Sequence, residues 1–451
     1  MVRAANVEEF LREFDTGSVD PGASALRREV LSFGESQWLS RDEIRERQLE
    51  KVRRVVRHAS KHSSLCASLY GGERRIGDWD DFFALPVMPR DSVAKLSQEA
   101  HLAPAAVPED AIHHWASTSG TSGRVVRSAV TSRMLRIGMA NRIRELQWHS
   151  VDPRSPIAEL TGPSTGNPDA WQPFDGGLIL KGWGGPMIRG LLRTGSMFKF
   201  DTSDDLGSVA ERLRKHGVEQ VMTTPTYAWT MRNRLGPNRW KNLQYRGEVV
   251  YPEIDACNLQ FVADYTWDVY GTNEVGHIAT SCPEGTVHHC IDECVLVEVV
   301  REDGEPSDVG EPGRVLLTDL RNFVTPFIRY EIGDIAVRGA CTCGRGLSAL
   351  ERIEGREIAR LKTEEGPRVA ASVVQTIHRL AGLQLFRLRQ TSLSEFVLTV
   401  VMDREWTEED GMKVQTAISK LIGEPASLRV ERVDDIKPHP SGKREKVFVE
   451  C

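Results

Sequence analysis

The stretch Thr118-Ser119-Gly120-Thr121-Ser122-Gly123-Arg124 decides how the rest of the chain is interpreted. Its glycines let backbone N–H groups turn toward an anion at positive φ. Its hydroxyls add hydrogen-bond donors, and Arg124 adds a planar guanidinium that suits phosphate. This composition is typical of a phosphate-binding loop, although the Walker spacing G-x-x-x-x-G-K-[ST] is absent. A flexible surface loop of serine and glycine is the alternative, and the stretch alone does not separate the two.

Length and composition narrow the class of protein. The 451 residues suffice for two or three domains, and 40% hydrophobic with 27% charged residues is ordinary for a globular protein. A net charge of -6 argues against a general nucleic-acid or membrane-surface binder. No apolar run approaches the ~20 residues of a membrane helix, and the N-terminus lacks the apolar core of a signal peptide. We therefore expect a cytoplasmic protein that binds neither nucleic acid nor membrane, whose eight cysteines are thiols or metal ligands.

The pattern of apolar residues predicts an α/β fold in two domains. Residues 1–100 and 132–148 show helical spacing, so the glycine loop is expected between an extended run and a helix. Short apolar runs alternate with helical stretches over residues 151–230, which predicts a parallel sheet covered on both faces. Hairpins over residues 295–340 predict an added β-barrel-like region. Together these features form a large N-terminal α/β domain.

Residues from about 355 onward predict a separate small α+β domain. Helices are expected at 371–383 and 408–422, and strands at 396–401, 427–433 and 447–450. The expected domains are therefore residues 1–354 and residues 355–451.

Three further stretches carry candidate binding chemistry. Tyr270-Gly271-Thr272-Asn273-Glu274 combines an aromatic ring, a hydroxyl and an acid that can hold Mg²⁺. Asp334 follows a glycine in Tyr330–Asp334 and can accept both hydroxyls of a ribose. Lys443 stands on a Ser-Gly turn near the C-terminus, where it is either solvated or delivered to a phosphate. Each stretch is ambiguous by itself.

Together and in this order, the stretches resemble the adenylate-forming superfamily of acyl-CoA ligases, adenylation domains and luciferases. The resemblance covers essentially the whole chain. It is closest to the phenylacetate–CoA ligase-like branch because of the short length, the segment Leu85–Asp91, and Cys341-Thr342-Cys343-Gly344-Arg345 ahead of Gly355-Arg356. It implies a C-terminal domain that is mobile and acts as a lid.

The resemblance also implies roles for individual residues. Thr118–Gly123 would hold the ATP phosphates, with Arg124 where a lysine is common. Tyr270 would flank the adenine, with Gly271 beside it in the ATP-binding motif, and Thr272 would meet the phosphate. The remaining roles fall to charged residues: Glu274 would bind Mg²⁺, Asp334 would take the ribose hydroxyls with Arg356 nearby, and Lys443 would assist catalysis at the bridging oxygen.

The implied reaction has two steps. A small, aromatic carboxylic acid attacks the α-phosphorus of ATP and releases pyrophosphate, and CoA then displaces AMP. At the hinge the family often reads Gly-Arg-x-x-Asp, whereas Ala359 stands at the Asp position here. That departure motivates an alternative in which the acceptor is an amine or a carrier protein, or in which an unusual acid or a hydroxyl is activated. A non-enzymatic nucleotide-binding module is the third hypothesis, and Glu274, Asp334 and Lys443 together argue against it. A homodimer is also left open.

A structural zinc site is a separate prediction. Cys282, His288, Cys341 and Cys343 supply three sulfurs and one imidazole, which fits a closed tetrahedral site. Relatives in the suggested branch share a similar arrangement. Rival ligands stand close by at His289, Cys290 and Cys294. A catalytic cysteine is disfavoured because none stands in an activated motif.

The sequence places the acid pocket only broadly, among residues 135–250. Six aromatic residues are candidates to line it, and more than half are expected to be ordinary core. They are Trp148, Trp171, Phe174, Trp183, Tyr227 and Trp229.

Overall fold

A computed structural model describes most of the chain. The described residues are 7–18, 20–95, 101–117, 125–161, 171–235, 239–356, 360–364, 366, 368–437 and 447–450. The glycine loop Thr118–Arg124, hinge residues 357–359 and Lys443 lie outside them, so the roles expected of these residues remain predictions. The chain forms two compact units that we describe one at a time. Unit 1 comprises Met1–Ser155, Leu180–Met197 and Trp267–Ile353, and unit 2 comprises Pro156–Ile179, Phe198–Thr266 and Glu354–Cys451. The expected domains 1–354 and 355–451 stay a prediction.

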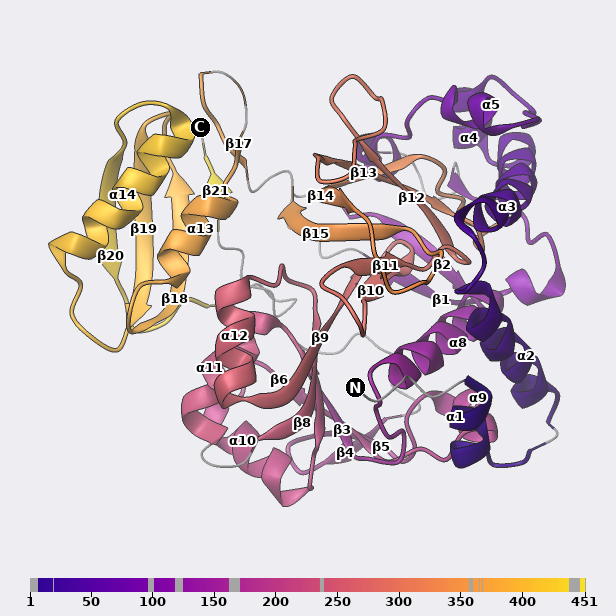
Figure 1. The fold of residues 1–451 in the computed structure, drawn as a ribbon, viewed down its shortest axis with the longest axis horizontal. Coiled ribbons are helices and arrows are strands. Elements are labelled where there is room, and N and C mark those ends of the chain that lie inside the picture. Colours follow the sequence, from indigo (N-terminus) through magenta and orange to yellow (C-terminus); the bar gives the residue numbers. More distant parts are fainter. Residues whose placement is uncertain are drawn as a thin grey trace. The chain divides into compact units, whose positions relative to one another are not determined.

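Unit 1 begins with helices whose ends follow the capping rules. Ser40 and Glu43 form a capping box at the start of α3, with the Glu43 carboxylate accepting from the Ser40 N–H at 2.8 Å. The hydroxyl of Thr131 accepts from the Met134 N–H and starts α8. The described helices of the unit are α1 (Val7–Phe14), α2 (Pro21–Ser36), α3 (Arg41–His62), α4 (Ser64–Tyr70), α5 (Trp79–Phe83), α6 (Arg90–Lys95), the 3₁₀ turn η1 (Pro108–Asp110), α8 (Ser132–Trp148) and α9 (Gly185–Leu191) (Figure 1).

The strands of unit 1 follow the order β12-β13-β14-β15-β11-β10-β9. The pairs with a defined register are antiparallel, and the expected β-barrel-like region corresponds to β12, β13 and β14 within this sheet. A separate antiparallel pair joins β1 to β2. The strands are β1 (Ile112–Ser117), β2 (Arg127–Thr131), β9 (Ala263–Thr272, from Trp267 in this unit), β10 (Gly276–Ser281), β11 (His288–Cys290), β12 (Val295–Val300), β13 (Pro312–Asp319), β14 (Tyr330–Gly339) and β15 (Ala349–Arg356, up to Ile353 in this unit).

The core of unit 1 joins the start of the chain to its middle. Val52, Val55 and Val56 of α3 are fully buried in one cluster with Phe327 and Tyr330. Hydrophobic burial therefore depends on residues more than 250 positions apart in the sequence. The described helices include none with the length and hydropathy that a membrane crossing would need.

Unit 2 contains the expected parallel strands. Strand β3 pairs in parallel with β7, and β7 pairs in parallel with β8. Helices α10 and α11 bury Val209, Leu213 and Met231 against these strands. The strand order is β8-β7-β3-β6-β5-β4. The elements are β3 (Ile157–Thr161), β4 (Gln172–Phe174), β5 (Gly177–Leu180), β6 (Met197–Asp201), α10 (Leu206–Lys215), β7 (Gln220–Thr223), α11 (Pro225–Leu235), β8 (Trp240–Arg246) and α12 (Pro252–Phe261).

The C-terminal stretch of unit 2 is an α+β layer, as expected. A sheet with the order β20-β19-β18-β21 has α13 and α14 on one face (Figure 1). Thr407 caps α14 through the backbone N–H of Asp410. The elements are β16 (Arg360–Leu361), β17 (Arg368–Val369), α13 (Ala371–His378), β18 (Leu383–Gln390), β19 (Glu395–Met402), α14 (Glu408–Ile422), β20 (Ser427–Arg432) and β21 (Val447–Val449).

Candidate active site and metal centre

The hairpin of β9 and β10 carries the Tyr270–Glu274 motif. Tyr270 pairs with Ala279 and Gly271 pairs with His277 across the two antiparallel strands. A Cβ at Gly271 would lie 2.7 Å from the carbonyl oxygen of Gly276, so the close approach of the strands requires glycine. The Thr272 hydroxyl accepts from the Val275 N–H at 3.3 Å and stabilises the turn.

Two predicted ATP-binding residues meet in unit 1. The Tyr270 hydroxyl donates to Asp334 Oδ2 at 2.7 Å, and both side chains are largely buried. Asp334 lies inside β14. Gly333 has φ +78° at a shift in register, where Arg314 pairs with Ile335 but Leu316 pairs with Glu331. This irregularity, typical of a bulge, directs Asp334 toward Tyr270.

Glu274 is buried beside an arginine that the sequence did not point to. Its Oε1 accepts from Arg90 Nη1 at 2.7 Å and from the Tyr330 hydroxyl at 3.3 Å. Its Oε2 is buried and has no hydrogen-bond partner among the described residues. A buried carboxylate oxygen without a partner suits a hard cation, so Glu274 fits the Mg²⁺ that the resemblance implies.

Arg90 reaches Glu274 because its segment pairs with β14. The Met88 N–H donates to the Arg329 carbonyl at 3.0 Å, and the Met88 carbonyl accepts from the Glu331 N–H at 3.0 Å. Arg90 comes two residues after this bridge. A single cation in a proline-containing connection gives no sequence signal that separates it from a surface arginine.

The ends of the glycine loop are described even though the loop is not. Ser117 at the end of β1 pairs with Arg127 of β2. Asn273 Nδ2 donates to the Ser117 carbonyl at 2.8 Å, which brings the last described residue before the loop to the Tyr270–Glu274 motif. Strand β2, which was not predicted, lies between the loop and α8. Arg356 ends β15, and its side chain lies outside the described part of the structure.

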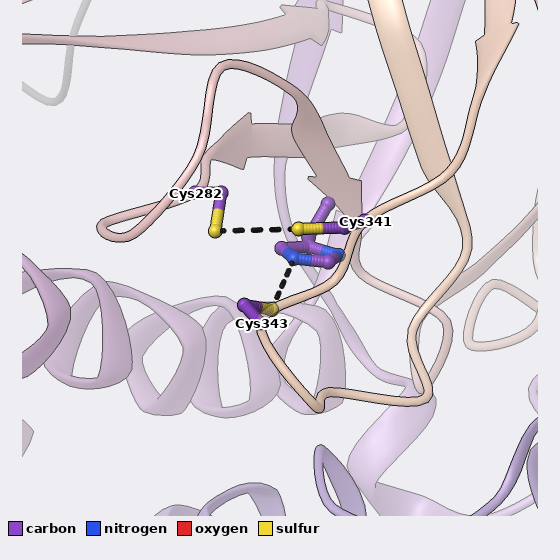
Figure 2. Close-up of side chains that lie close together, drawn as sticks. Cys282, Cys341 and Cys343 are labelled. Carbon is purple, nitrogen blue, oxygen red and sulfur yellow. Dashed lines mark hydrogen bonds between the residues drawn. The ribbon is translucent and has the colours of Figure 1, made fainter.

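Three cysteines and one histidine form a compact cluster in unit 1. Cys282, His289, Cys341 and Cys343 each offer a ligand atom, and these atoms lie within 4.8 Å of one another. The sulfurs of Cys341 and Cys282 are 3.8 Å apart, and His289 Nε2 is 3.2 Å from the Cys343 sulfur. Figure 2 shows the three cysteines facing one another from two loops. Thiolates about 2.3 Å from a tetrahedral zinc would be about 3.8 Å apart, so the cluster has the dimensions of a structural zinc site.

The structure groups His289, and not the expected His288, with the three cysteines. His288 Nε2 instead contacts Asp268 Oδ2 at 2.9 Å, away from the sulfurs. His288 and His289 are neighbours in β11, where successive side chains point to opposite faces. Burial lowers the pKa of His289 to about 4, so its ring is neutral near pH 7, as a ligand must be.

Most of the aromatic residues considered for the acid pocket belong to the core. The side chains of Trp148, Trp183, Tyr227 and Trp229 are buried. Trp148 donates to Gln37 Oε1 at 2.8 Å. Phe174 is exposed over 38% of its surface. These residues therefore do not define a pocket by themselves.

The chain is similar in fold to solved structures of CoA ligases. The chain superimposes on a 2-hydroxyisobutyryl-CoA ligase, in the postadenylation state with R3-HIB-AMP, with a TM-score of 0.73 and 16% identity. The match covers 92% of this chain and 91% of that chain. The fold is that of adenylate-forming CoA ligases.

Other structures share this ligase fold at lower similarity. An anthranilate CoA ligase in complex with anthranoyl-AMP has a TM-score of 0.55 and 12% identity, and covers 77% of this chain and 68% of its own. An amide bond synthetase from Marinactinospora thermotolerans has a TM-score of 0.54 and 16% identity, with coverage of 80% and 74%. No protein-family model and no curated protein matches the sequence.

Proposed function

We propose that the chain uses ATP to activate a small, aromatic carboxylic acid as its acyl-adenylate and then transfers the acyl group to CoA. In the first step a carboxylate oxygen bonds to the α-phosphorus and pyrophosphate leaves. In the second step a thiol sulfur bonds to the acyl carbon and AMP leaves. We assign the enzyme to the phenylacetate–CoA ligase-like branch and to the cytoplasm, where its cysteines stay reduced.

One observation carries the proposal. In unit 1 of a chain with the ligase fold, Tyr270 donates to Asp334, and Glu274 of the same motif is buried beside Arg90. Asn273 holds the end of β1 next to this motif. The ring, the two acids and the entry to a glycine loop are the groups that an adenylate-forming site needs. Solved structures of the same fold include a 2-hydroxyisobutyryl-CoA ligase in complex with 2-HIB-AMP and CoA, and an anthranilate CoA ligase in complex with anthranoyl-AMP.

The proposed roles follow from these contacts and from the resemblance. Tyr270, Gly271 and Thr272 bind the nucleotide, and Asp334 accepts the ribose hydroxyls with Arg356 nearby. Thr118–Arg124 binds the phosphates. Glu274 would hold Mg²⁺, which neutralises charge on the phosphates when bound. Lys443, delivered by a lid of residues 355–451, stabilises the charge that develops on the reacting oxygens.

Two observations favour an alternative acceptor for the second step. One structure with this fold is named an amide bond synthetase, and the chain has Ala359 where the family often has Asp. An amine or a carrier-protein thiol is therefore the alternative acceptor, and an unusual acid or a hydroxyl is the alternative substrate.

We also propose a structural role for the Cys/His cluster. Cys282, His289, Cys341 and Cys343 would hold Zn²⁺ and join the β10–β11 turn to the segment before β15. The cluster lies outside the Tyr270–Asp334 contact, and it takes no part in the proposed reaction.

Acid-dependent release of pyrophosphate tests the proposed function. The purified chain is mixed with ATP, MgCl₂ and one acid at a time from a panel of small aromatic, hydroxy and dicarboxylic acids. We expect one class of acid to release pyrophosphate, and CoA to convert the bound adenylate to a thioester and AMP. Glu274→Gln should lower the first step by about 100-fold or more. Pyrophosphate release by no acid in the panel would contradict adenylation. Adenylate formation without any acceleration by CoA would favour the alternative acceptors.

A further inference from the structure

A buried carboxylate faces a histidine beside the Tyr270–Glu274 motif. Glu145 lies on α8 with a fully buried side chain, and His277 lies on β10 with a side chain that is 35% exposed. His277 Nδ1 is 3.1 Å from Glu145 Oε1. Asn141 Nδ2 donates to the same oxygen at 2.7 Å, and Arg142 Nη1 donates to Oε2 at 3.4 Å. None of these four residues was expected from the sequence to act in the reaction.

The charges around this pair fix the orientation of the imidazole. Burial by itself would raise the pKa of Glu145, but His277 and then Arg142 offset it and hold the pKa at about 2. Burial lowers the pKa of the neighbouring His149 to about 3, so His149 is neutral near pH 7. Glu145 is therefore an anion, and its hydrogen bond to His277 requires a proton on Nδ1.

The other nitrogen of His277 is left available. Nε2 has no hydrogen-bond partner among the described residues, and the side chain is partly accessible. A buried carboxylate that orients a histidine through Nδ1, with Nε2 presented outward, is the arrangement by which proteins build a general base.

The position of the pair connects it to the reaction. His277 pairs with Gly271 of the Tyr270–Glu274 motif in the β9–β10 hairpin. Its side chain therefore shares the face of Gly271, and Tyr270 and Thr272 project from the opposite face. Helix α8 begins at Ser132, next to β2, whose partner β1 leads into the glycine loop. The pair therefore bridges the two elements that flank the candidate nucleotide site.

Only the second step of the proposed reaction needs a base. A carboxylic acid is already ionised near pH 7, whereas a thiol must lose its proton as it attacks. Asp334 accepts from Tyr270, and Glu274 is paired with Arg90 through Oε1, while its Oε2 is assigned to Mg²⁺ under the proposed function. His277 Nε2 is a ring nitrogen at this hairpin that has no partner in the described part of the structure.

We propose that His277 is the general base of acyl transfer and that Glu145 is its positioning residue. This inference rests on the proposed function. His277 Nε2 takes the proton of the acceptor thiol as the sulfur bonds to the acyl carbon. The bond from that carbon to the phosphate oxygen breaks, and AMP leaves with the electron pair. Glu145 stabilises the imidazolium that forms.

Single-turnover kinetics on the bound acyl-adenylate tests the inference. The adenylate is first formed with the acid identified in the pyrophosphate assay, and CoA is then added. We expect His277→Ala to slow CoA-dependent AMP release by about 100-fold or more, with adenylation changed by less than about threefold. His277→Gln, which keeps a donor toward Glu145 but has no basic nitrogen, should show the same loss. The exposed His62→Ala serves as the matched control and should lose nothing in either step.

Two readouts separate a base from a merely structural residue. Added imidazole should restore part of the transfer rate in His277→Ala, and an aryl thiol of low pKa should lose much less rate than CoA. For Glu145→Gln, the fold decrease in the transfer rate should exceed the fold increase in the KM for CoA.

Equal loss in both steps, or full CoA-dependent transfer in His277→Gln, would overturn the inference while the proposed function stands. A wild-type chain that forms no adenylate would overturn the proposed function and this inference together.

Discussion

Removing the guanidinium of Arg329 should destabilise unit 1 by about 5–7 kcal/mol. Arg329 is buried just before β14, where Nη2 donates to Glu298 Oε1 at 2.9 Å and Nε donates to the same oxygen at 3.1 Å. Nη1 donates to the carbonyls of Phe83 and Leu85 at 2.5 and 2.6 Å. Leaving a buried carboxylate uncompensated costs about 3–5 kcal/mol. Each carbonyl without its donor adds about 1 kcal/mol after partial hydration.

The assay is urea denaturation of Arg329→Ala, in which the fluorescence of the ten tryptophans is the signal that reports unfolding. A loss of about 5–7 kcal/mol is a large share of the usual free energy of unfolding of about 5–15 kcal/mol, so the urea midpoint should fall steeply. The double variant Glu298→Leu, Arg329→Met removes both charges, and we expect it to cost at least about 2 kcal/mol less than Arg329→Ala.

Acid provides a second check on the same variant. Burial raises the pKa of Glu298 even beside Arg329, and loss of the guanidinium raises it further. A raised folded-state pKa means that stability is lost as pH rises through it, so the deficit of Arg329→Ala should shrink between pH 7 and pH 5. A loss below about 1 kcal/mol, or a double variant as unstable as Arg329→Ala, would refute the argument from buried charge.

Three further changes test the candidate sites. His289→Ala should reduce zinc from one ion per chain to almost none by elemental mass spectrometry, whereas His288→Ala should keep it; equal retention would contradict the ligand set. Tyr270→Phe removes the hydroxyl that donates to the Asp334 carboxylate, a charge-assisted hydrogen bond worth about 1.5–3 kcal/mol. The KM for ATP in pyrophosphate exchange should therefore rise roughly tenfold or more. An unchanged KM would count against the nucleotide-binding role of Tyr270. Burial lowers the pKa of His149 to about 3, against about 6.5 in the unfolded chain. Its contribution to stability is therefore intact above pH ~6.5 and is lost on acidification toward pH 3, at up to about 1.4 kcal/mol per pH unit; His149→Gln should flatten this slope in urea titrations at pH 5 to 6.5, and an unaltered slope would contradict it.

Periodicity predicted the elements whose packing is local. The helix expected at 132–148 is α8, and the helix expected at 408–422 is α14. The strand expected at 427–433 is β20, which ends one residue earlier. In these stretches, apolar spacing and caps agree with the final structure because one face of each element is buried.

Site geometry was less predictable because it depends on register and on distant pairing. The choice between His288 and His289 is a choice between the two faces of β11, and pairing with β10 and β15 makes it. Arg90 reaches Glu274 only through the Met88 bridge to β14. The contact of His277 with Glu145 likewise joins residues 132 positions apart. Motif order indicates the family of fold, but it does not reveal these long-range contacts.

The hydrogen bonds from Arg329 to the carbonyls of Phe83 and Leu85 have a consequence while the chain is made on the ribosome. Their donor follows the acceptors by 246 and 244 residues. At about 5–20 residues per second, a ribosome needs roughly 10–50 s to cover that distance. Until the end of that interval Phe82 and the valines of α3, which are fully buried in the finished cluster, lack Phe327 and Tyr330 of the same cluster. The nascent N-terminal helices should therefore be a preferred client segment for chaperones that hold unfolded chains.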